Sequence, residues 1–181
     1  MASFTERMIG AAMLNPRTYE EVEADQTATT QAMIVVLLTS LVSGLGALRQ
    51  GILPVLGVIL GALVAWFVFA GLVYLIGTKL LPEPGTHADI GQLLRTLGFA
   101  TVPQFVMILG FIPVVGCLLA VVVFVWRLAT SVMAVKQALD YQSTPRAVGV
   151  VLLGFLAYLM LVLILGLFGM GASMGMGMMG R

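Results

Sequence analysis

The sequence contains very little charge. Charged residues make up 9% of the 181 residues, nine Lys and Arg against eight Asp and Glu, so the net charge is +1. A typical globular domain has roughly 25% charged residues. The mean hydropathy of +1.09 leaves too little polar surface to coat a water-soluble particle of this size. These values exclude a soluble domain, and the lack of a basic block excludes a nucleic-acid-binding protein.

The residues that usually carry chemistry are also scarce. Cys117 is the only cysteine and His87 the only histidine. A disulfide-stabilised scaffold is therefore excluded. The sequence shows no Ser/His/Asp set, no paired carboxylates, no phosphate-binding loop and no metal-ligand spacing. We therefore predict a non-enzymatic protein without catalytic residues, bound cofactor or resident metal.

Much of the sequence consists of long apolar stretches without charged residues. Four stretches of 23, 29, 31 and 34 residues contain no Asp, Glu, Lys or Arg. A helix that spans a membrane needs about 20 apolar residues. The third stretch would rise about 46 Å as one helix, against about 30 Å of hydrocarbon, and Gly110–Pro113 interrupts it. We therefore predict an all-α membrane bundle of five helices over residues 30–48, 54–78, 90–109 (kinked near Pro103), 113–138 and 145–168.

The distribution of Lys and Arg predicts the orientation. In the five-span arrangement six basic residues lie on the side of the N-terminus and two on the other side. Four spans, with residues 88–104 lying on the surface, would give five against four. Only five spans give a clear positive-inside bias, which predicts a cytoplasmic N-terminus and an external C-terminus.

The two ends of the chain differ from the apolar region. Residues 1–29 predict a short cytosolic or interfacial helical segment, because Ser3 and Glu6 form a capping box and Asn15-Pro16 starts a second helix. The acids of this segment weaken the alternative of attachment to an anionic membrane surface. Residues 169–181, rich in Met and Gly, predict a disordered tail. Its thioethers suit Cu(I), which leaves metal capture as the alternative there.

Small residues form a row on the second predicted span. Gly57, Gly61 and Ala65 are spaced four residues apart. Small residues on one stripe let two helices approach closely in lipid. We therefore expect these three residues to contact a neighbouring helix.

Arg127 is the most informative single residue, because it lies near the middle of the fourth predicted span. An Arg at mid-membrane costs at least about 2.5–3.5 kcal/mol. Because spans three and four are antiparallel, Gln104 and Pro103 fall at a similar depth. Together, Arg127, Gln104 and Pro103 predict an intramembrane polar site that holds an anion or a lipid headgroup. The alternative is a structural role, in which Arg127 snorkels or joins two helices.

The segment Leu94–Pro103 resembles the signature of the Yip-domain family, polytopic membrane proteins named for interaction with Ypt/Rab GTPases. That signature places a glycine, an aromatic residue, an alanine and then a proline in the third span. The matching residues here are Gly98, Phe99, Ala100 and Pro103, and the break at 110–113, Trp126 and the Asn15-Pro16…Tyr19 segment also resemble bacterial members.

The resemblance implies five spans and a cytosolic N-terminus, in a prokaryotic inner or plasma membrane. Eukaryotic relatives have a long N-terminal region, whereas about 29 residues precede the first span here. GTPase binding is therefore not carried over.

We thus expect a membrane organiser or accessory subunit that acts through helix packing and contacts with lipid, with other membrane proteins or with itself. The alternative is a small oligomeric carrier or lipid-handling protein with an internal site around Arg127. A closed bundle with Arg127 bonded to helix carbonyls favours the former, and an open polar cleft favours the latter.

Overall fold

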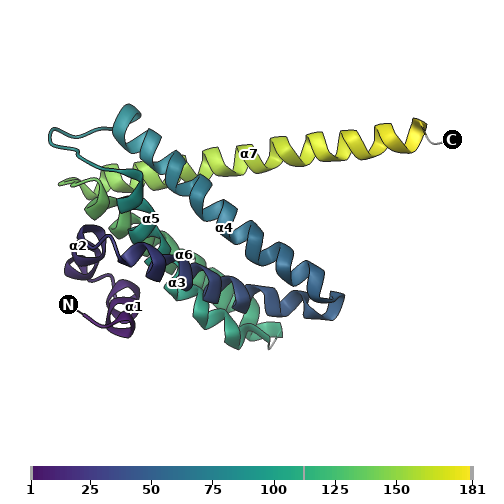
Figure 1. Ribbon diagram of the computed structural model, residues 1–181, viewed down its shortest axis with the longest axis horizontal. Helices are drawn as coiled ribbons and strands as arrows, with labels where there is room; N and C mark the ends of the chain where they lie inside the picture. The colour runs from purple at the N-terminus through teal and green to yellow at the C-terminus, as the bar shows by residue number, and fades with distance from the viewer. Residues whose placement is uncertain (1, 112, 180–181) are drawn as a thin grey trace.

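The computed structural model describes residues 2–111 and 113–179, with side chains described for residues 2–110 and 115–167. This part of the chain consists of helices and short connections (Figure 1). The α-helices are α1 (Phe4–Ala12), α2 (Pro16–Ala24), α3 (Ala28–Gly44), α4 (Ile52–Leu75), α5 (Ile90–Phe99), α6 (Pro113–Ala138) and α7 (Thr144–Met179). Three of them continue in another helical form: 3₁₀ turns η1 (Leu45–Gln50) after α3, a π turn η2 (Ile76–Leu80) after α4, and 3₁₀ turns η3 (Val102–Phe111) after α5.

Five helical segments of the described chain are long and apolar enough to cross a membrane, as the sequence predicts. They are Ala28–Gln50, Ile52–Leu80, Ile90–Gly110, Val115–Ala138 and Thr144–Leu167. The irregularity expected near Pro103 is a change of helix type, because α5 ends at Phe99 and the chain continues as 3₁₀ turns from Val102. Pro103 has no amide hydrogen and cannot continue the α-helical hydrogen bonds.

Helix α5 forms the centre of the bundle. All residues from Leu93 to Phe99 are buried. It packs between α3, α4 and α6, while α7 packs on α4 and α6. The second half of α7 projects away from the other helices (Figure 1). The surfaces of α4, α6 and α7 carry many exposed Leu, Val and Phe side chains, as lipid-facing helices do.

The predicted contact of Gly57 and Gly61 with a neighbouring helix is wrong within this chain. Both glycines are exposed, and a Cβ added at either one would meet no atom within 4 Å. Ala65 is half-buried and lies in the wall of an internal cavity. The close approach occurs instead at Gly98 on α5, where an added Cβ would lie 2.7 Å from the Cβ of Ala32 on α3.

The N-terminal helices α1 and α2 pack against α5 and α6. The predicted capping box is present, because Ser3 and Glu6 each accept a hydrogen bond from the other's backbone amide. The Trp126 indole on α6 donates to the Ala12 carbonyl at 2.7 Å, and Arg95 on α5 donates to the Glu23 carbonyl. These bonds join the ends of α1 and α2 to the bundle.

An ion-pair cluster fastens α1 to α2 and to the start of α3. Arg7 is only 2% exposed. Its guanidinium lies 2.8 Å from carboxylate oxygens of both Glu21 and Asp25, and it also donates to Gln31. The buried Tyr19 hydroxyl donates to the Ala11 carbonyl. Arg7 is thus a charged residue in the interior of the N-terminal segment.

Glu23 titrates in an unusual range. Burial, together with the nearby charges of Asp140, Glu20 and Asp89, raises the pKa of Glu23 from its ordinary 4.5 to about 7, while Arg95 acts in the opposite direction. A raised carboxyl pKa gives stability that is complete below pH 4.5 and is lost as the pH rises through about 7, because the unfolded chain releases its proton first.

We therefore expect Glu23→Gln to be more stable than the unchanged protein at pH 8. The expected gain is about 1 kcal/mol after allowance for solvent screening, and it should vanish near pH 4.5. Thermal unfolding in detergent between pH 4.5 and 8 measures the difference. Arg17→Gln, an exposed substitution on the same helix, is the control. A pH-independent difference between Glu23→Gln and the unchanged protein contradicts this account.

The C-terminal end differs in length from the prediction. Helix α7 ends at Met179, beyond the expected end of the fifth span at residue 168. The backbone of residues 169–179, in the stretch predicted to be a disordered Met/Gly tail (169–181), continues α7. The side chains from residue 168 onward and residues 180–181 lie outside the described residues.

Candidate functional site

A cavity of about 330 Å³ lies between α3, α4, α5 with η3, α6 and α7. Each of the five spans contributes a residue at its midpoint or next to it. The cavity-lining residues nearest the midpoints of the five spans are Thr39, Trp66, Thr101, Arg127 and Phe155. The cavity is therefore centred at the depth that would be the middle of a membrane.

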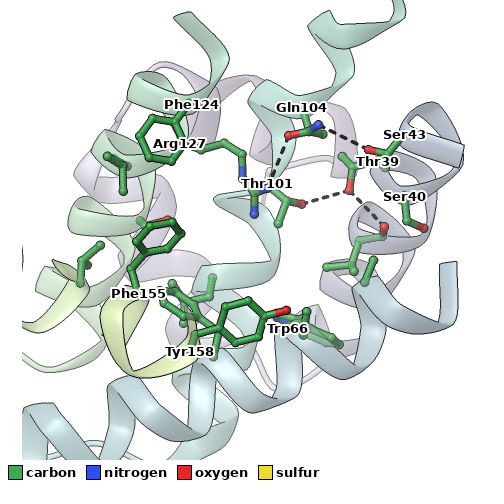
Figure 2. Close-up of a pocket in the computed structure, with 18 residues that line it drawn as sticks. Thr39, Ser40, Ser43, Trp66, Thr101, Gln104, Phe124, Arg127, Phe155 and Tyr158 are labelled. Carbon is green, nitrogen blue, oxygen red and sulfur yellow. Dashed lines mark hydrogen bonds between the residues drawn. The ribbon is translucent and has the colours of Figure 1, made fainter. Parts of the chain in front are cut away.

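Arg127 reaches into this cavity from α6 (Figure 2). Its side chain is exposed there rather than enclosed by protein atoms. Its Nη1 donates to Oε1 of Gln104 at 3.4 Å, and Nε2 of Gln104 donates to Oγ of Ser43 at 3.4 Å. The predicted proximity of Arg127 and Gln104 is confirmed. Since the amide of Gln104 bonds on both sides, its oxygen is held towards the guanidinium.

The other expected partners of Arg127 are engaged elsewhere. Pro103 is buried and lies outside the cavity lining. The carbonyls of Gly98 and Ala100 accept hydrogen bonds from the hydroxyls of Thr101 and Thr130. Thr101 in the third span and Thr130 on α6 thus satisfy two backbone carbonyls at the end of α5.

The cavity has two chemically different walls (Figure 2). Thr39, Ser43 and Gln104 line the polar side, on α3 and η3. Aromatic side chains of α4, α6 and α7 line much of the remainder, together with aliphatic residues and the hydroxyl-bearing Ser131 of α6. The aromatic residues are Trp66, Phe69, Phe124, Phe155 and Tyr158. The rings of Phe124 and Phe155 pack edge to face, with their centroids 5.9 Å apart.

The charge in the lining is of one sign. Arg127 is its only charged residue, and no Asp or Glu occurs among the described residues that line the cavity. A guanidinium has five N–H donors, of which the Gln104 contact uses one. The cavity is therefore suited to hold an anion beside a polar wall, with apolar material against the aromatic wall.

Sequence reasoning identified Arg127 and Gln104 but not the hydroxyl groups. Thr39, Ser40, Ser43 and Thr101 come together here from two spans. A usable signal was present, because each hydroxyl lies in the middle part of an otherwise apolar span. Single Ser and Thr residues are common in membrane helices, so the pattern alone did not distinguish them.

The residues of the glycine–aromatic–alanine–proline signature form the packing beside the cavity. Gly98 faces Ala32, and the buried Phe99 ring lies 6.3 Å from the ring of Phe4 on α1. The carbonyl of Ala100 accepts the hydroxyl of Thr130 on α6. The signature thus joins α1, α3 and α6 to the broken third span.

The fold and the site define a multi-pass helical membrane protein with a polar cavity at mid-depth. The chain matches the Yip1 domain model over residues 11–175, and it belongs to that family. The resemblance inferred from Gly98, Phe99, Ala100 and Pro103 is thereby confirmed. No curated protein and no solved structure is significantly similar to the chain.

Proposed function

We propose that this Yip1-family protein binds an anionic amphiphile in the mid-membrane cavity and acts as a small lipid-handling or carrier protein. The observation that carries the proposal is the exposed guanidinium of Arg127 in a cavity whose described lining contains no carboxylate. A charge at this depth is expensive, and charged residues inside membranes mark substrate pathways or binding sites. A bound anion would neutralise Arg127 where the protein does not.

The broken third span supports the same role. Non-helical or irregular backbone at membrane depth is tolerated where it lines a cavity. Discontinuous helices at the midplane are also typical of substrate sites in transporters. Here α5 ends at Phe99 and η3 begins at Val102, and Thr101 between them lines the cavity. Since five spans lack the usual repeated halves, a carrier of this kind would work as an oligomer.

The organiser role predicts a different structure. It calls for a closed bundle, with Arg127 bonded to helix carbonyls and the Gly57/Gly61 stripe in contact with another helix. The cavity and the Arg127–Gln104 contact favour the binding role. The proposed role requires no covalent chemistry.

We expect Arg127→Leu to lower ligand binding and activity much more than stability. Arg127 lies at membrane depth, where a charge is costly, so an apolar side chain there should be neutral or stabilising for the fold, whereas loss of the cation should weaken anion binding by about tenfold or more. Native mass spectrometry of protein extracted in mild detergent measures the bound anionic lipid, and thermal unfolding measures stability. Arg49→Leu, which removes an exposed Arg at the end of the first span, is the matched control. Full activity of Arg127→Leu in a complementation assay, with bound lipid unchanged, contradicts the proposal.

We further propose a prokaryotic inner or plasma membrane location, with the N-terminus in the cytoplasm and the C-terminus outside. The six-to-two division of Lys and Arg supports this orientation. Reporter fusions active only in the cytoplasm or only in the periplasm should therefore give opposite signals at the two ends. The same signal at both ends would contradict the five-span topology.

A further inference from the structure

We propose that the ligand carries hydroxyl donors next to its single negative charge, the chemistry of a phosphoglycerol headgroup. This proposal rests on the proposed anion site and specifies what occupies it. It follows from which atoms of the polar wall donate hydrogen bonds and which are left to accept them.

The hydroxyl protons of the polar wall are already used inside the protein. Thr39 donates to the carbonyl of Val35 at 2.9 Å, and Ser43 donates to the carbonyl of Thr39 at 3.2 Å. Ser40 likewise donates to its own helix at 2.8 Å, and Thr101 donates within the third span at 2.7 Å. A hydroxyl has one proton and two lone pairs. These four groups therefore present oxygen acceptors, not donors, to a ligand.

The charged donor of the cavity is Arg127, which contacts Gln104 beside the polar wall, and the hydroxyls of Ser131 and Tyr158 also line the cavity. Arg127 supplies the positive charge, and its contact with Gln104 leaves four N–H groups for an anion. One guanidinium matches one negative charge, as in a phosphodiester. The ligand that complements both walls has its anion at Arg127 and its donors towards α3.

The hydrogen-bond donors of the ligand that point towards α3 are neutral groups. An ammonium group would lie near Arg127 in a site where the described lining provides no carboxylate to balance it. Like charges repel strongly in surroundings of low dielectric constant. Hydroxyl groups avoid this repulsion, and the acceptor oxygens of Ser40 and Ser43 can receive them. This reasoning selects a polyol phosphodiester over a zwitterionic aminoalcohol phosphodiester.

The size of the cavity fits a headgroup rather than a whole lipid. Ligand pockets usually measure about 300–1,000 Å³, and this cavity, about 330 Å³, is at the small end of that range. The aromatic wall formed by Trp66, Phe155 and Tyr158 offers apolar surface to the first part of an acyl chain. The rest of any chain would remain in the surrounding lipid.

The test compares three phosphodiester lipids with different headgroups on the full-length protein in detergent by native mass spectrometry. Phosphatidylglycerol has the hydroxyl donors, phosphatidylethanol has the same phosphodiester charge without them, and phosphatidylethanolamine has an ammonium donor. We expect phosphatidylglycerol to bind about tenfold more tightly than the other two, the effect of one or two hydrogen bonds. This comparison needs no variant.

Two variants separate the parts of the site. Ser40→Ala should reduce the preference for phosphatidylglycerol, while Ser43, which accepts the hydrogen bond that positions Gln104, stays intact. Arg127→Gln should weaken the binding of both lipids. Thr78→Ala is the control, because the Thr78 hydroxyl also bonds to its own helix but lies outside the cavity.

The outcomes distinguish this inference from the proposed function. Equal, Arg127-dependent binding of phosphatidylglycerol and phosphatidylethanol overturns the assignment of hydroxyl donors and leaves the anion site standing. Tighter binding of phosphatidylethanolamine overturns the choice of a neutral donor. Binding that does not depend on Arg127 overturns both proposals. Competition with glycerophosphoglycerol identifies the source: displacement supports a water-soluble phosphoglycerol ligand, and lack of displacement supports the lipid headgroup.

Discussion

Gly98→Leu is expected to prevent recovery of folded protein, and Gly98→Ala to cost about 1–3 kcal/mol. Gly98 is where α5 crosses α3, and an added Cβ would lie 2.7 Å from the Cβ of Ala32 and 3.2 Å from its backbone. Backbone atoms cannot rotate away as the end of a flexible side chain can, so the two helices would have to separate. Thermal unfolding in detergent and size-exclusion chromatography measure the effect.

The matched control is Gly57→Leu, the same change on a glycine where an added Cβ meets no atom of the chain. We expect it to leave monomer stability nearly unchanged. Ala32→Gly should partly rescue Gly98→Ala, because it removes the atom that the new methyl group meets. Equal stability of Gly98→Leu and Gly57→Leu would contradict the close approach of α3 and α5.

Arg7→Met is expected to release the N-terminal helices from the bundle at a cost of about 2 kcal/mol. Methionine retains most of the apolar stem, so the change isolates the guanidinium. Glu21 and Asp25 would lose the cation that lies 2.8 Å from each. Both carboxylates retain some exposure to water, which limits the cost. Hydrogen exchange of residues 2–24 should increase more than exchange in the spans.

Arg17→Met, at an exposed position of α2, is the control and should have no such effect. Acidification offers an independent check. The hydrogen bond from Thr27, together with Arg7, lowers the pKa of Asp25 from 3.8 to about 2. A lowered pKa gives stability that is present above pH 3.8 and is lost as the pH falls through about 2. Unchanged exchange of residues 2–24 in Arg7→Met would show that the ion pairs do not hold this segment.

The positions of the five spans could be predicted because charge and Pro mark their ends. Pro113 starts α6 at the predicted residue, and Ala138 ends it there. The proximity of Arg127 and Gln104 was also predictable, because a tight turn between antiparallel helices fixes their relative depth. Counting residues from that turn gives the depth of each side chain in the membrane, and this does not require knowing on which face of its helix the side chain lies.

The faces of the helices could not be predicted in the same way. A span is apolar both where it meets lipid and where it meets another helix, so hydrophobic periodicity does not distinguish the two sides of α4. Gly57 and Gly61 on α4 were therefore assigned to a contact that Gly98 on α5 makes. The burial of Arg7 was equally inaccessible, because several acids precede the first span and the sequence does not show which of them it meets.

The bond between Trp126 and Ala12 has a consequence for synthesis of the chain on the ribosome. Its two ends are 114 residues apart, and the bond between Arg95 and Glu23 joins residues 72 apart. At about 5–20 residues per second, the gap of 114 residues takes about 6–23 s to translate. Helices α1 and α2 are therefore made first, and their contacts with α5 and α6 can be completed only after Trp126 in the fourth span has been synthesised.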